Sequence, residues 1–102
     1  MMTHRTLTAR LALTLALTFA TALSASAACY ADYKAKQDNP LRLQYGVIAL
    51  DPADCKRPRR VQATIAARIA QDGWTLLNVL SIFGPEGLAE RKDSAGAYFL
   101  RY

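Results

Sequence analysis

The chain has 102 residues, enough for one domain, and its thirteen lysines and arginines against eight acidic residues give a formal net charge of +5. It contains two cysteines and one histidine, without the residue spacing of a metal site, a glycine-rich phosphate loop or a catalytic triad. We therefore expect neither an enzyme nor a protein that holds a metal or another cofactor.

The first 27 residues have the pattern of a secretory signal peptide. Arg5 and Arg10 precede an uncharged apolar run from Leu11 to Leu23, and the small residues Ala25-Ser26-Ala27 follow it. The apolar run is short for a bilayer crossing, which needs about 20 residues, so we expect cleavage rather than retention as an anchor. We place the cut after Ala27, with Ala28 as the alternative, which leaves one domain of residues 28–102.

Cleavage changes what the exported chain contains. It removes two basic residues and the only histidine, His4, so eleven basic and eight acidic residues remain and the net charge is +3. No imidazole is then left to act as a general base or a metal ligand. Ser26 lies three places before Cys29, where a lipoprotein signal has a large aliphatic residue, so a lipid anchor is the less favoured alternative. We expect a periplasmic or secreted protein with no membrane span after cleavage.

The two cysteines, Cys29 and Cys55, predict a disulfide bond. An even number of cysteines in a small exported domain favours pairing over free thiols, and neither a CxxC spacing nor a nearby histidine indicates redox chemistry. A domain of this size buries a modest fraction of its surface, so a disulfide would supply a large share of its stability.

The first predicted strand covers residues 41–50, after the turn signal Asp38-Asn39-Pro40. The preceding segment, residues 30–36, suits either a hairpin partner of this strand or a short helix. Hairpin pairing, with Lys36 near Arg42, would bring Cys29 beside residues 49–50 and within reach of Cys55.

A helix is predicted from Pro58 or Arg59 to Asp72, after a polar connection over residues 51–58. Val61, Ile65 and Ile69 recur at helical spacing and form its apolar face. Gly73 then provides the C-terminal stop, because it adopts the left-handed conformation that ends helices.

Two more strands are predicted after the helix, over residues 74–81 and 97–102. The first is apolar on both faces, with Trp74, Leu76 and Asn78 on one and Leu77 and Val79 on the other, which predicts a central strand with Trp74 in the core. Residues 82–96 form a predicted long loop, in which residues 88–92 extend one strand edge.

These elements predict an α+β fold, in which one amphipathic helix packs on one face of a small, mostly antiparallel sheet of three or four strands. The stretch IAARIAQDGWTLLNV, residues 65–79, followed by AYFLRY resembles a small bacterial domain family of unknown function. Its members have the order strand, helix, Gly-Trp, strand, loop, strand. The matching residues are Ala66, Ile69, Gly73, Trp74, Leu76, Val79, Tyr98 and Leu100. The resemblance implies the same α+β fold and no activity.

Two groups of residues are candidate binding sites. The first is the basic cluster Lys56, Arg57, Arg59 and Arg60, which either binds an anion or a partner or forms a solvated surface. The second is the long loop, which either recognises a partner or only connects two strands. Its candidate recognition residues are Phe83, Glu86, Leu88, Glu90, Arg91 and Lys92.

We therefore expect an exported accessory module that binds an envelope protein or an anionic envelope polymer. Nucleic acid is not an expected partner, because no aromatic residues alternate with the basic ones to stack bases. One alternative is a structural protein that forms a homodimer through its last strand. The other is a small hydrolase using Ser81 or Ser94, which the loss of the histidine disfavours.

Overall fold

The computed structural model of the protein describes residues 27–102, so the predicted signal peptide, apart from Ala27, lies outside the described residues. The described chain begins with a hairpin of β1 (Cys29–Gln37) and β2 (Arg42–Leu50). The two strands are antiparallel, with Cys29 opposite Leu50 and Lys36 opposite Leu43. The hairpin prediction is confirmed, and residues 30–36 form a strand rather than a helix.

The helix α2 (Pro58–Ala70) follows, as predicted, and leads into β3 (Thr75–Phe83). β3 pairs antiparallel with β1, so the strand order in the sheet is β2-β1-β3. The prediction of a central position for this strand is wrong, because β1 is central and β3 lies at an edge. The apolar run was misleading because Leu77 and Leu80, 48% and 43% exposed, face solvent instead of a second buried layer.

Two irregularities break the alternation of side chains along β3. Asp32 lies opposite Ser81 while the next residue, Tyr33, lies opposite Val79, so Leu80 has no partner in β1. A second shift of register leaves Leu77 without a partner in the same way. These β-bulges re-aim the residues that follow them. Leu76, Val79 and Ile82 therefore all pack toward the core. The predicted assignment of alternating residues to two faces is wrong for Val79 and for Asn78, which lies opposite the exposed Lys34.

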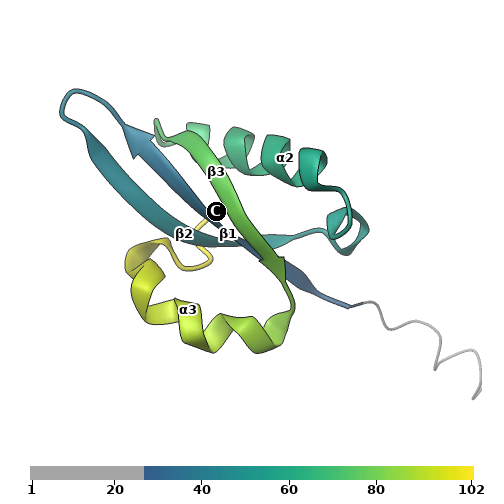
Figure 1. Ribbon diagram of the computed structural model, residues 1–102. Coiled ribbons are helices and arrows are strands. Elements are labelled where there is room, and N and C mark those ends of the chain that lie inside the picture. Colours follow the sequence, from purple (N-terminus) through teal and green to yellow (C-terminus); the bar gives the residue numbers. More distant parts are fainter. Residues whose placement is uncertain (1–26) are drawn as a thin grey trace, which may run out of the picture.

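The main core lies between α2 and one face of the sheet (Figure 1). Val61, Ile65 and Ile69 are fully buried and pack on a sheet face that includes Tyr33 and Ile48. Trp74 is buried at the end of this core, as predicted. The helix ends at Ala70, two residues before the predicted Asp72, and a turn over residues 71–73 follows. The turn closes at Gly73, whose φ of 80° lets the chain reverse so that the Trp74 N–H donates to the Ile69 carbonyl at 3.2 Å.

The segment after β3 is helical, so the prediction of a long loop over residues 82–96 is wrong. A short 3₁₀ turn, η2 (Pro85–Gly87), leads into the helix α3 (Leu88–Ala95), which covers the face of the sheet opposite α2 (Figure 1). The segment 88–92 is thus no strand extension. At eight residues α3 is too short to show a clear apolar periodicity, and its attachment to the sheet is largely polar.

The C-terminal segment is not a strand, so the prediction for residues 97–102 is also wrong. A 3₁₀ turn, η3 (Gly96–Tyr98), is followed by an extended tail that makes a single bridge, between Phe99 and Val47 of β2. Gly96 and Leu100 have left-handed φ values of 53° and 55°, which interrupt any continuous strand. The tail instead carries Tyr98 and Tyr102 to the core on the α2 side.

The architecture is therefore an α+β fold with a three-stranded antiparallel sheet, as predicted in class. It differs from the prediction in having a helix on each face of the sheet, of which α2 is the longer. As a result, α3 covers the sheet face opposite α2, and the C-terminal tail covers the outer edge of β2. The outer edge of β3 stays uncovered by the described residues.

Candidate binding groove

The predicted disulfide is present and fixes the start of the sheet. Cys29 in β1 is bonded to Cys55, with their Cα atoms 6.0 Å apart. Cys55 lies just after the 3₁₀ turn η1 (Pro52–Asp54), so the bond ties the beginning of β1 to the connection that leads into α2. This bond fits a protein of an oxidising compartment such as the periplasm or the extracellular space.

The two outer edges of the sheet differ in whether another segment of the chain pairs with them. At the outer edge of β2, the Leu100 N–H of the C-terminal tail donates to the Val47 carbonyl at 2.8 Å. At the other edge, β3 pairs only with β1 within residues 27–102. An unpaired strand edge presents free backbone N–H and C=O groups that can pair with another chain.

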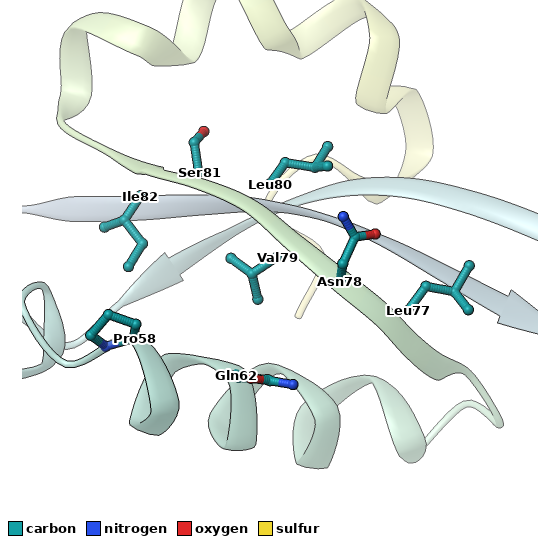
Figure 2. Close-up of a pocket in the computed structure, with 8 residues that line it drawn as sticks. All are labelled: Pro58, Gln62, Leu77, Asn78, Val79, Leu80, Ser81 and Ile82. Atoms are coloured by element: carbon teal, nitrogen blue, oxygen red, sulfur yellow. The ribbon is translucent and has the colours of Figure 1, made fainter.

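A groove runs along this open edge, between β3 and α2. It consists of two adjoining hollows of about 420 and 510 Å³ that share Gln62. Figure 2 shows the first, where Val79 and Ile82 of β3 point toward α2 and face Pro58 and Gln62. The second continues along the helix to Ala70 and along the strand to Thr75. We call these two hollows together the β3–α2 groove; it follows β3 for nearly its whole length.

The orientation of α2 about its own axis determines which of its residues line the groove. The Arg68 guanidinium donates to the Ala49 carbonyl of β2 at 2.8 Å, which holds one side of the helix against the far part of the sheet. The opposite side of the helix faces β3 and presents Ala63, Ala66 and Ala70. Because these side chains are small, the helix leaves space beside the strand instead of closing over its edge.

The strand wall of the groove carries the exposed leucines. Leu77 and Leu80, the two residues displaced by the bulges, both line the first hollow. Exposed leucines beside free backbone groups combine apolar contact area with hydrogen-bonding capacity. Such a combination is suited to binding an extended peptide.

The predicted basic cluster lies at one end of the groove. Its residues are exposed and occupy the connection before α2 and the first turn of the helix. Arg60 forms an ion pair with Asp54 at 3.1 Å, and Arg59 lines the second hollow. In the described part of the chain, Lys56, Arg57 and Arg59 make no ion pair. None of the described residues that line the groove is acidic.

The residues predicted as a recognition loop are distributed over three elements. Phe83 ends β3, where it stacks with Tyr30 at 6.1 Å between ring centroids, and the Arg91 guanidinium lies 4.0 Å from its ring. Glu86 is exposed in η2, while Leu88 is partly buried and Glu90 and Lys92 are exposed in α3. They form no loop, and their proposed role in recognition stays a prediction.

A polar cluster that was not predicted holds the sheet and α3 together. Asp32, in β1, is 6% exposed and accepts hydrogen bonds from Tyr45 of β2 at 2.8 Å and from Ser81 of β3 at 2.6 Å. It also accepts one from Nε of Arg91 in α3 at 3.1 Å. One carboxylate thereby joins all three strands to the second helix.

The environment of Asp32 makes it a weak base. Burial raises its pKa, but the hydrogen bonds from Ser81, Tyr45 and Arg91 outweigh burial, so the pKa lies below its ordinary value of 3.8. Burial and the Asp32 carboxylate together raise the pKa of Tyr45 to about 12. Ser81 therefore donates to a carboxylate that is poorly suited to accept its proton, and the arrangement is that of a structural clamp.

Comparisons with protein-family models, with curated proteins and with solved structures find no match to this chain. The resemblance to the bacterial family of unknown function therefore stays a prediction. Within the described residues, no group of three or more histidine, cysteine, aspartate or glutamate side chains could hold a metal ion. In that same part of the chain, no helix is long and apolar enough to cross a membrane.

One sign of the groove in the sequence was read differently. Ala66 and Ala70 were expected to widen the apolar face formed by Val61, Ile65 and Ile69, whereas the structure places them with Ala63 on a second, shallow face that lines the groove. The open edge of β3 could not be read from the sequence in the same way. Its location depends on which strand β1 pairs with, and that is a long-range property.

Proposed function

We propose that this protein is an exported, non-catalytic binding module of the cell envelope, and that it binds an extended segment of another protein along the β3–α2 groove. The observation that carries this proposal is the open edge of β3 beside a groove lined with exposed leucines. The segment would pair with free backbone groups of β3 and place alternate side chains against the groove, as peptides do when they add a strand to a sheet.

The size of the groove fits a short segment. β3 has nine residues, and a strand rises by about 3.3 Å per residue, so an added segment of seven to nine residues would span it. The two bulges interrupt the edge, and bulges at sheet edges limit unrestricted pairing between copies. This favours a short segment of a partner over continued growth of the sheet.

Export of the protein is supported by the signal-peptide pattern of residues 1–27 and by the Cys29–Cys55 bond. Non-catalytic action is supported by the tightly held Asp32–Ser81 pair and by the absence of histidine from residues 28–102. An envelope protein is therefore the partner class that we favour.

Selection from a displayed library of random nonapeptides tests the proposal. The target is the full chain, expressed for export and recovered with its disulfide formed. We expect enriched peptides that bind the native protein and lose at least tenfold in affinity when Leu77 and Leu80 are both changed to serine, since the change removes apolar contact area from the strand without adding a charge. The matched control is Leu41→Ser, at an exposed leucine of the hairpin turn that lines neither hollow of the groove.

Three results would count against the proposal. They are the absence of any enrichment on the native protein, equal binding by the double-serine variant with an unchanged melting temperature, and a dimer that excludes peptides from the groove. The last would assign the groove to a second copy of this chain, and light scattering detects it directly.

A further inference from the structure

We infer that the segment bound by the β3–α2 groove is acidic, carrying aspartate or glutamate at the end that lies beside Pro58 and Ile82. This inference rests on the proposed function, since it names the chemistry of the partner that the same groove takes. It is carried by the distribution of charge around the groove, which is one-sided.

The first observation concerns the groove walls. β3 has the sequence TLLNVLSIF and contributes no charge, and α2 contributes Arg59 as the only charged residue lining the groove among those described. Gln62 and Asn78 add polar side chains that can accept or donate a hydrogen bond. A bound segment therefore meets positive charge and neutral polar groups, and no carboxylate that would repel its own.

The second observation concerns the open end of the groove. Pro58 and Ile82 lie at one end of the first hollow (Figure 2). Lys56 and Arg57 directly precede Pro58 in the chain, so two cations adjoin the end where a bound segment would enter or leave. The neighbouring Arg60 is paired with Asp54, whereas Lys56, Arg57 and Arg59 are exposed and make no ion pair within residues 27–102. Their charges are thus free to attract an anionic group.

These observations favour an acidic peptide over two other occupants. A second copy would present its own β3, which has no charged residue to meet the three free cations. A flexible anionic polymer would be attracted by the cations, but it would make no apolar contact with Leu77 and Leu80, the exposed leucines of the first hollow. An acidic peptide with apolar side chains in alternation matches both features at once.

The test measures the composition of the nonapeptides selected on the native, disulfide-bonded protein. We expect aspartate and glutamate to be enriched over the starting library, mainly at one end of the peptides. Changing Arg57 and Arg59 together to glutamine should weaken an enriched peptide about fivefold, from the contribution of two exposed charge pairs. Raising the salt concentration from about 0.05 to 0.5 M should weaken it by a similar factor.

The matched control removes two positive charges elsewhere. The double variant Lys36→Gln and Arg101→Gln has the same net charge as the arginine variant, but its changes lie outside both groove hollows. Affinity for the enriched peptide should stay within twofold of the native value. If the two double variants weaken binding equally, net charge and not the groove is responsible, and the inference is overturned.

The remaining outcomes separate this inference from the function it rests on. Enriched peptides that are neutral or basic, yet still fail to bind the Leu77 and Leu80 double-serine variant, would overturn the acidic preference and leave the binding groove in place. Failure to enrich any peptide would overturn the binding function itself. Equal binding of dextran sulfate by native protein and double-serine variant, with displacement of the peptide, would assign the cations to a polymer.

Discussion

The Asp32 carboxylate, on the central strand, accepts a hydrogen bond from Nε of Arg91 at 3.1 Å, and this contact attaches helix α3 to the sheet. Arg91 also donates to the Gly87 carbonyl at 2.8 Å, so it closes the turn that precedes its own helix. The pair holds α3 on the sheet face opposite α2. With α3 held there, the edge of β3 and the β3–α2 groove stay uncovered. The Asp32–Arg91 pair therefore helps to keep the proposed binding surface accessible.

Asp32→Asn should destabilise the fold by about 2 kcal/mol. The change removes the buried charge that three donors share and, among the described residues, leaves Arg91 paired only with the exposed Glu90. Urea unfolding of the purified protein measures the effect. Asp93→Asn, at an exposed carboxylate of the same helix α3, is the matched control and should change stability by less than about 0.5 kcal/mol.

The stability of the protein should fall in acid, and Asp32 should account for part of the fall. Its pKa in the folded protein is lowered, so its stabilising contribution is complete above the ordinary pKa of 3.8 and is lost as the pH falls through the lower folded value. Urea unfolding between pH 2 and pH 6 tests this. The curve for Asp32→Asn should be flatter below pH 4, and a curve parallel to that of the native protein would show that Asp32 is not the titrating group.

Two tyrosines on the hairpin should respond in opposite ways to loss of the hydroxyl. Tyr45→Phe removes a hydrogen bond to Asp32 and should cost about 1.5 kcal/mol. The Tyr33 hydroxyl is buried without a hydrogen-bond partner among the described protein groups, so Tyr33→Phe should be neutral or stabilising. Thermal unfolding distinguishes the two variants. A larger loss from Tyr33→Phe than from Tyr45→Phe would contradict this assignment of partners.

Removing the disulfide should lower the free energy of unfolding by about 3.5 kcal/mol, because the unfolded chain then regains the entropy lost by closing a loop between cysteines 26 residues apart. The variant with both Cys29 and Cys55 changed to alanine avoids mispaired thiols. Unfolding in urea with and without reductant gives the measurement: reductant should destabilise the native protein and have no effect on the variant. No response of the native protein to full reduction would show that the bond contributes little.

Truncation after Tyr98 should expose the outer edge of β2. The deleted residues include Leu100, whose N–H is bonded to Val47, and Tyr102, whose hydroxyl donates to Asp72 at 2.7 Å. We expect the free energy of unfolding to fall by about 2 kcal/mol. We also expect a new tendency to dimerise, since an uncovered strand edge pairs with its copy. Light scattering at several concentrations measures the second effect. A truncated protein that stays monomeric up to high concentration would show that the tail does not protect this edge.

The sequence predicted the elements whose signals are local. The hairpin and its register followed from the turn at residues 38–40, and the disulfide from the even number of cysteines in an exported domain. The helix followed from the spacing of Val61, Ile65 and Ile69, and its end was predicted to within two residues from Gly73. The predicted anion-binding cluster also lies where the sequence placed it, next to the first turn of the helix.

The failures all depend on tertiary contacts. The helix α3 is too short to show periodicity, and its hold on the sheet comes from Asp32, which lies 59 residues before Arg91. The last residues are apolar like a strand, but they pass the edge of β2 and place Tyr98 against Trp74 at 5.6 Å. The two bulges that expose Leu77 and Leu80 result from pairing with β1 and have no signal in β3 alone.

Hydrogen–deuterium exchange of the native, disulfide-bonded protein, with and without an enriched acidic nonapeptide, tests the central claim most directly. We predict that the peptide slows exchange of backbone amides in β3 and leaves those at the hairpin turn, residues 38–41, unchanged. The double-serine variant at Leu77 and Leu80 should show no such protection at the same peptide concentration. Protection confined to β2 or to α3, with β3 unaffected, would contradict the assignment of the groove as the binding site.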